Sequence, residues 1–146
     1  MEFTVRDAEA GDAGPIAGLS GVLGYPIEPR AVRAILGRLL GRPDQRVYVA
    51  VSPSGAACGW LQAHSCEVLE SGLRVEIMGL VVSPQARRRG VGRALVARAE
   101  AWASELGAGY VVVRSNVKRE ESHAFYPALG YSPSKTQAVY RKSLRA

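Results

Sequence analysis

Residues 76–106, EIMGLVVSPQARRRGVGRALVARAEAWASEL, contain the pattern that decides the fold. The apolar run of residues 77–82 predicts a β-strand, and Pro84 ends it. Three arginines and the pair Gly90 and Gly92 follow. From there to residue 106, apolar residues recur every three or four positions, which predicts an amphipathic helix. Its apolar stripe consists of Val91, Leu95, Ala99, Trp102 and Leu106.

The turn between this strand and this helix has the chemistry of an anion site. The first N–H groups of a helix have no partner within the helix, and the helix dipole makes that end positive. Gly90 and Gly92 carry no Cβ, so a ligand can approach the backbone, and Arg87, Arg88 and Arg89 add charge. We therefore predict a phosphate or pyrophosphate site. The turn has neither the Gly-Lys-Ser/Thr of a P-loop nor the three-glycine spacing of a dinucleotide fingerprint.

Length and composition indicate a globular protein. The chain has 146 residues, 47% of them apolar, and we expect residues 1–146 to form a single domain. No apolar run is long enough for a membrane span and no signal peptide is evident, so we expect a cytoplasmic protein. Cys58 and Cys66 are then reduced thiols, and with His64 as the one nearby histidine we expect no metal site. The net charge of +6 is mostly scattered, which argues against a nucleic-acid partner.

The pattern of apolar runs and turn signals predicts an α/β (α+β) fold. Strands are expected at residues 3–7, 47–51, 57–69, 73–82 and 109–115, with one or two more in residues 131–143. Helices are expected at residues 10–23, 29–40, 90–106 and 119–129. A strand, a helix and a strand in succession imply a right-handed crossover and a parallel pair. The expected architecture is a mixed, mostly antiparallel twisted sheet of roughly six or seven strands, with about four helices on its two faces.

The string Arg87-x-x-Gly90-x-Gly92, after a strand that ends at residues 80–82, resembles the coenzyme A pyrophosphate motif of the GNAT superfamily of N-acetyltransferases. Two further features agree with this family. Asn116 follows the strand of residues 110–115, and residues 124–131, AFYPALGY, look like the family's FY-x-x-LG-F/Y signature. The resemblance implies a fold in which the central parallel strands splay apart to admit coenzyme A.

The resemblance also implies the residues that bind acetyl-CoA. Backbone groups of residues 80–82 would bond the acyl-pantetheine arm like an extra strand, and the basic turn would bind the pyrophosphate. Asn116 would bond the pantetheine or order a water, although a strand-end cap is the alternative. The implied binding residues are Leu80, Val81, Val82, Arg87, Arg88, Arg89, Gly90, Val91, Gly92, Arg93, Asn116, His123 and Tyr126.

Tyr126 is the candidate acid. In the family a tyrosine at this position donates a proton to the coenzyme A sulfur; the alternative is a core aromatic. Pro127 removes a helix hydrogen bond and disfavours helical geometry at Tyr126, so we expect a kink there.

Glu76 is the candidate base, because it precedes Gly90 by the spacing at which some family members place a catalytic glutamate. A carboxylate within an apolar sheet is expected to have a raised pKa. The alternatives are that Glu76 binds a cationic substrate or acts through water, and His123 and His64 are rival bases. Strand alternation places on one face Arg74, Glu76, Met78, Leu80 and Val82.

The function expected from these residues is N-acetyl transfer from acetyl-CoA to a primary amine, by direct attack in a ternary complex. A small-molecule amine is the favoured acceptor, because no extended peptide groove is legible. An aminoglycoside-like polyamine, an amino acid and a protein N-terminus or lysine also stay open as acceptors. The alternatives from other classes are a catalytically silent coenzyme A-binding or sensor module and nucleic-acid binding. A homodimer is the common case for such chains.

Overall fold

The computed structural model describes residues 2–114 and 120–145, without the side chains of residues 120–123. The chain divides into two compact units, Met1–Arg114 and Ser115–Ala146. The elements of the first unit are β1 (Thr4–Asp7), η1 (Ala10–Asp12), α1 (Ala13–Val22), α2 (Pro29–Leu40), β2 (Gln45–Val51), β3 (Ala57–Val68), β4 (Gly72–Val82), η2 (Pro84–Ala86), α3 (Val91–Leu106) and β5 (Tyr110–Val113). The second unit contains α4 (Glu120–Ala128). These bounds agree closely with the predicted ones.

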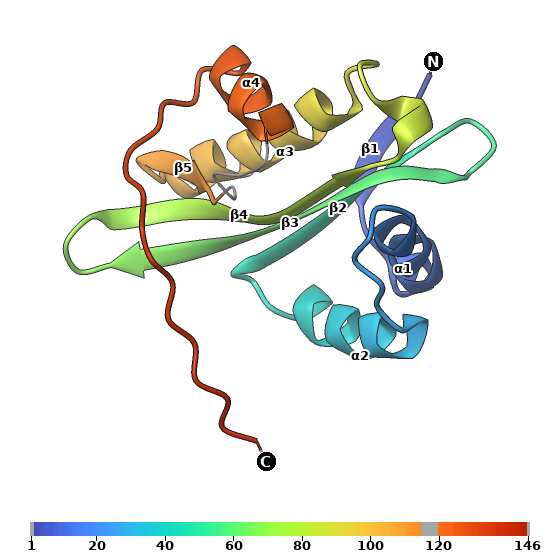
Figure 1. The fold of residues 1–146 in the computed structure, drawn as a ribbon, viewed down its shortest axis with the longest axis horizontal. Helices are drawn as coiled ribbons and strands as arrows, with labels where there is room; N and C mark the ends of the chain where they lie inside the picture. Colours follow the sequence, from blue (N-terminus) through green and yellow to red (C-terminus); the bar gives the residue numbers. More distant parts are fainter. Residues whose placement is uncertain (1, 115–119, 146) are drawn as a thin grey trace. The chain divides into compact units, whose positions relative to one another are not determined.

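The five strands form one sheet in the order β1-β2-β3-β4-β5. The pairs from β1 to β4 are antiparallel, and β4 and β5 are parallel. As Figure 1 shows, α3 makes the crossover between the two parallel strands on one face of the sheet, and α1 and α2 cover the other face. This is the mixed, mostly antiparallel architecture that the sequence predicts.

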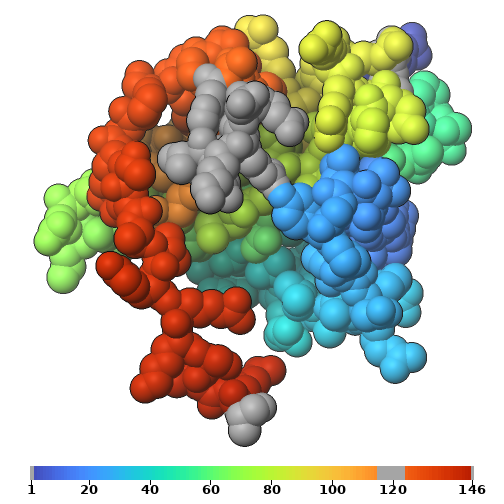
Figure 2. All heavy atoms as spheres, viewed as in Figure 1, coloured from blue at the N-terminus to red at the C-terminus, as the bar shows by residue number. Residues whose placement is uncertain are grey.

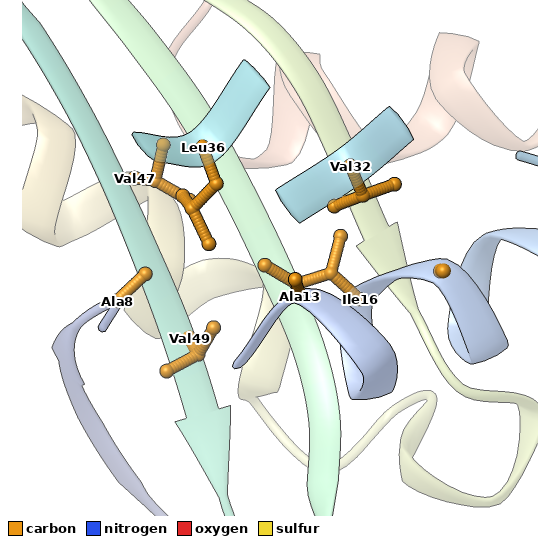
Figure 3. Close-up of a cluster of buried hydrophobic side chains, with 8 residues drawn as sticks. Ala8, Ala13, Ile16, Val32, Leu36, Val47 and Val49 are labelled. Atoms are coloured by element: carbon orange, nitrogen blue, oxygen red, sulfur yellow. The ribbon is translucent and has the colours of Figure 1, made fainter. Parts of the chain in front are cut away.

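The helices α1 and α2 are held to the sheet by a cluster of buried apolar side chains (Figure 3). Ile16 of α1 and Val32 and Leu36 of α2 pack with Val47 and Val49 of β2. Burial of such side chains stabilises the fold by roughly 1.5–3 kcal/mol each relative to leaving them exposed. This cluster holds α1 and α2 on the face of the sheet opposite to α3.

The helix α3 packs through the predicted stripe. Val91, Leu95, Ala99 and Trp102 are all buried, whereas Leu106 at the end of the helix is 40% exposed. Gly59 of β3 permits the close approach of the helix, since a Cβ there would lie 3.0 Å from Val91 Cγ1. This contact holds the start of α3, and the turn before it, against the sheet.

The strand β4 contains a β-bulge at Met78. In the ladder with β3, Gln62 pairs with Gly79 and Ala63 pairs with Ile77, so Met78 is the extra residue. Because side chains alternate with a period of two, one extra residue moves every later side chain to the other face.

The bulge corrects the expected arrangement of side chains on β4. Val82 pairs with Gly59 and lies on the α3 face, together with Leu80. Glu76 pairs with His64 of β3, which lies on the same face of that strand as Trp60. Because Trp60 packs against the α1–α2 cluster, Glu76 lies on the α1–α2 face. The prediction that Glu76 shares a face with Leu80 and Val82 is therefore wrong.

The second unit departs from the prediction in its strands. Residues 131–145 contain no strand, so the described sheet has five strands rather than six or seven. Side chains of this segment, red in Figure 2, are largely exposed, among them Val139 at 87% and Tyr140 at 93%. Pro133 and the scattered apolar residues give this segment little with which to hold a strand, since strand formation depends on packing against neighbours.

Candidate active site

The strand β4 has an edge that is paired along only part of its length. Within residues 2–114, pairing with β5 ends at Ile77 and Val113, whereas pairing with β3 continues to Val82. The backbone groups of residues 78–82 on the β5 side thus have no strand partner in this part of the chain. Such an edge can bind an extended ligand through main-chain hydrogen bonds. Leu80, Val81 and Val82 are half-buried, so their side chains pack while the backbone edge is left for a ligand.

This edge leads directly into the basic turn. Ser83 N–H donates to Cys58 O at 2.9 Å, and η2 follows with Ala86 fully buried. Arg88 (φ 63°) and Gly90 (φ 84°) both have left-handed backbone conformations. The left-handed conformation comes at little cost to glycine but is uncommon for arginine.

The turn presents positive charge at the start of α3. Arg87, Arg88, Arg89 and Gly90 are exposed, whereas Val91 is buried and anchors the helix. Gly90 is the residue before the helix and has no side chain that could cap it. Its backbone is open as well, since an added Cβ would meet no atom within 4 Å. Exposed arginines beside an uncapped helix start fit a phosphate-bearing ligand.

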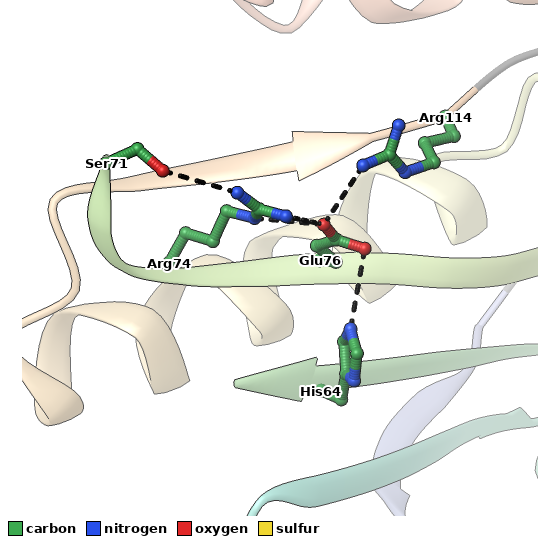
Figure 4. A network of polar contacts seen from close by, with 5 residues as sticks. All are labelled: His64, Ser71, Arg74, Glu76 and Arg114. Atoms are coloured by element: carbon green, nitrogen blue, oxygen red, sulfur yellow. Dashed lines mark hydrogen bonds and ion pairs between the residues drawn. The ribbon is translucent and has the colours of Figure 1, made fainter. Parts of the chain in front are cut away.

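Glu76 lies at the centre of a polar network on the α1–α2 face, drawn in Figure 4, although its side chain is only 7% exposed. Arg74 Nε donates to Glu76 Oε1 at 2.9 Å, and Arg74 Nη2 donates to the same oxygen. Arg114 Nη2 lies 3.4 Å from Oε1, and His64 Nε2 lies 3.4 Å from Oε2. One buried carboxylate is thus surrounded by two guanidinium groups and an imidazole.

This network gives Glu76 a lowered pKa. Desolvation by burial is the largest single influence and raises the pKa, but hydrogen bonds from Arg74 and His64 and the charges of Arg74 and Arg114 together outweigh it. The expectation of a raised pKa is therefore wrong. It considered the apolar sheet around Glu76 and left out the arginines that the fold brings to it. At neutral pH Glu76 is a carboxylate and a weak proton acceptor.

The sequence placed Arg74 on the same face as Glu76, but the effect of Arg74 on the pKa of Glu76 was not predicted, and Arg114 was missed. Arg74 is also hydrogen-bonded to Tyr110, its partner across the parallel ladder, and this bond and Glu76 raise the pKa of Arg74. The signal for Arg74 was its place two residues before Glu76 on one strand. The signal for Arg114 was its place directly after the buried valines of β5, but only the pairing of β4 with β5 brings it to Glu76. His64, predicted as a rival base, contacts Glu76 instead.

Of the remaining predicted residues, Gly92 and Arg93 lie in the first turn of α3, and the others belong to the second unit. Asn116 and the side chain of His123 lie outside the described residues. Tyr126 is in α4, where its ring makes edge-on contacts with Phe125 and Tyr131. Pro127 lies inside α4, one residue before its end. The roles of Tyr126, Asn116 and His123 stay predictions.

The described part of the chain contains no group of three or more His, Cys, Asp or Glu residues that could hold a metal ion. None of the helices within residues 2–114 and 120–145 is both long enough and apolar enough to span a bilayer.

Comparison with known families decides the class. Residues 19–131 match the model of the acetyltransferase (GNAT) family. The chain belongs to this family. It is a GNAT N-acetyltransferase, an enzyme that transfers acetyl groups to amines, and the match spans both the partly paired edge of β4 and the basic turn.

Relatives of this acetyltransferase are named for aminoglycoside and aminoalkylphosphonate acceptors. It is 26% identical over 145 residues to an aminoglycoside N(6')-acetyltransferase type 1 of Stenotrophomonas maltophilia, covering 97% of this chain and 94% of that enzyme. A shorter match, 41% identical, joins 40% of this chain to 38% of an aminoalkylphosphonate N-acetyltransferase of Salmonella typhimurium. The solved structure of AAC(6')-Iy in complex with the bisubstrate analog CoA-S-monomethyl-acetylneamine has the same fold, with a TM-score of 0.86 and 21% identity, covering 98% of this chain and 99% of that chain.

Proposed function

We propose that this enzyme transfers the acetyl group of acetyl-CoA to the primary amine of a small molecule, in a ternary complex. One observation carries the proposal: the edge of β4 that has no strand partner among the described residues leads directly into an exposed, arginine-rich turn at the start of α3. The combination suits a ligand with an extended amide-bearing arm and a pyrophosphate. The relatives named above act on small amines, which supports a small acceptor.

The basic turn is proposed to bind the pyrophosphate. Arg87, Arg88 and Arg89 supply charge, and the backbone N–H groups of Val91, Gly92 and Arg93 supply donors at the helix start. The residues of β4 from Leu80 to Val82 are proposed to bond the pantetheine arm through their backbone. Both roles use backbone groups or exposed arginines, so no buried side chain has to move.

Chemistry is proposed at the point where β4 and β5 stop pairing, next to Glu76. The amine nitrogen attacks the thioester carbonyl carbon, the nitrogen loses a proton to water, and the carbon–sulfur bond breaks. Because the pKa of Glu76 is lowered, we assign it to attracting the ammonium group and ordering the water that accepts this proton. Tyr126 is proposed to give its phenolic proton to the leaving thiolate.

The first test is calorimetric titration with acetyl-CoA, followed by a thiol-release assay on a panel of small amines. Binding with turnover is expected. The substitution Tyr126→Phe should lower kcat by about 10²-fold, as loss of a general acid does, and change the acetyl-CoA Kd less than about twofold. Tyr140→Phe is the control, since Tyr140 is 93% exposed in the same unit. Equal kcat values for the two variants would remove Tyr126 as the acid, and an absence of acetyl-CoA binding would refute the proposed function.

A further inference from the structure

Glu76 and His64, which the sequence offers as alternative bases, lie in contact in the structure. The two residues are paired directly across the ladder of β3 and β4. His64 Nε2 lies 3.4 Å from Glu76 Oε2, as Figure 4 shows. Paired residues of neighbouring strands place their side chains side by side on one face of the sheet. Strand register therefore brings the imidazole to the carboxylate.

The contacts of Glu76 are divided unequally between its two oxygens. Oε1 accepts hydrogen bonds from Nε and Nη2 of Arg74, and Arg114 Nη2 lies 3.4 Å from the same oxygen. Oε2 has one contact among the described residues, with His64. A carboxylate has about four lone-pair sites, shared between its two oxygens. Oε1 is therefore fully used by the arginines, whereas Oε2 can accept one more hydrogen bond.

The direction of this unused lone pair depends on His64. The Glu76 side chain is only 7% exposed, and a buried polar group keeps the orientation that its hydrogen-bond partners give it. The arginines hold Oε1, and the imidazole lies against Oε2. With guanidinium groups at one oxygen and an imidazole at the other, the carboxylate cannot turn about its terminal bond without losing contacts.

The position of Glu76 relates this lone pair to the reacting centre. Glu76 is one residue before Ile77, where the pairing of β4 with β5 ends. The proposed acetyl transfer needs Glu76 to attract the ammonium group and to order the water that takes its proton. Because Oε1 is fully used, both tasks belong to the unused lone pair of Oε2.

We propose that His64 is a positioning residue for acetyl transfer, whose Nε2–H holds Glu76 Oε2 so that the remaining lone pair points at the acceptor nitrogen or at the water beside it. This inference rests on the proposed function and adds a residue to the same site. The imidazole keeps its proton throughout, unlike a base, because a facing carboxylate favours the tautomer with the hydrogen on the facing nitrogen.

The test moves the N–H donor between the positions of the two ring nitrogens. The amide nitrogen of glutamine can take the place of Nε2, whereas that of asparagine reaches only the place of Nδ1. Thiol release is measured with saturating acetyl-CoA and with neamine, 2-aminoethylphosphonate or 1-aminobutane as acceptor. His64→Gln should keep kcat/KM within about threefold of wild type, and His64→Asn should lower it at least about tenfold, since a misplaced group loses rate steeply. The acetyl-CoA Kd should change less than about twofold in both variants.

The outcomes separate positioning from proton transfer and from the proposed function. An equal loss of at least about tenfold in both variants means that the imidazole itself takes the proton, and it overturns the positioning role. Values near wild type in both variants overturn it as well. Either result leaves acetyl transfer intact when the wild type turns over one of the three amines. A wild type that binds no acetyl-CoA, or acetylates none of them, refutes the proposed function and the role of His64 with it. Both variants replace a side chain that is 27% exposed by another polar one, so both are expected to fold, and thermal melting checks this.

Discussion

Glu76 shows how far a single residue can be predicted from the sequence. Its place in the strand before the basic turn was evident, and it is buried in the sheet as expected. Its charge state was not evident, because the pKa of Glu76 depends on Arg74, Arg114 and His64. These residues come from β4, from the end of β5 and from β3. A carboxylate's burial follows from a local pattern, but its partners follow from strand pairing.

The stability of the fold should depend on this carboxylate. Glu76→Gln leaves two guanidinium groups beside a neutral amide, and losing one member of a buried charge network costs about 3 kcal/mol of unfolding free energy. Glu67→Gln, in an exposed position of the neighbouring strand β3, should cost less than about 0.5 kcal/mol. Urea unfolding at pH 7 measures both. Equal losses in the two variants would contradict the network's contribution.

The same residue predicts an acid dependence. The folded-state pKa of Glu76 is below its ordinary value of 4.5, so folding favours the ionised form. Its contribution is fully present above that ordinary value and is lost as pH falls through the folded pKa. The difference in unfolding free energy between wild type and Glu76→Gln should be constant from pH 7 to about pH 6 and shrink below about pH 4.5. Asp12, whose pKa Arg6 lowers in the same way, cancels in this difference. A difference that grows on acidification would mean that the pKa is raised.

At the scale of elements, apolar periodicity was enough to predict most of the helices and strands of the first unit. The bounds of α2 and α3 follow from Pro29 and from the stripe that begins at Val91. The bulge at Met78 was not predictable, because the run of apolar residues in β4 reads the same with or without an extra residue. The bulge only becomes visible when β4 is paired with β3, and it decides which face Glu76 occupies.

The element that joins β4 to α3 can be tested by comparing the two ends of one helix. Gly90 and Gly107 flank α3, have φ values of 84° and 73°, and would each accept a Cβ without a contact within 4 Å. Alanine at either site should cost about 1 kcal/mol of stability, from the left-handed backbone alone. Only Gly90→Ala should weaken acetyl-CoA binding, by about tenfold or more, because only Gly90 belongs to the proposed phosphate site. Calorimetric Kd values for the two variants decide this, and equal values would exclude the turn from the site.

At the scale of the whole molecule, the sequence predicted the order of elements, the parallel pair and the helices on both faces, because these follow from chain order and handedness. The strands expected in residues 131–143 are absent from the described structure, since a segment with scattered apolar residues forms a strand only where a partner and a packed face exist. The expectations of one domain, a homodimer and a cytoplasmic location depend on contacts and surroundings that lie beyond one chain's pattern, and they stay predictions.

Acetyl-CoA should stabilise the whole fold, because the proposed site joins β4 to α3 and a ligand that binds only the folded state shifts the unfolding equilibrium. At a hundred times its Kd, it adds about 2.7 kcal/mol, which for a chain of this size raises Tm by roughly 5–10 °C. Adenosine at the same concentration has no phosphate for the arginines of the turn and no arm for the edge of β4, and should raise Tm by less than about 1 °C.

In Gly90→Ala the rise in Tm caused by acetyl-CoA, measured at the same acetyl-CoA concentration as for the wild type, should fall by about half. A tenfold weaker Kd removes about 1.4 kcal/mol of the stabilisation by the ligand. Differential scanning calorimetry measures these shifts, and a rise with adenosine equal to that with acetyl-CoA would show that neither the turn nor the β4 edge holds the ligand.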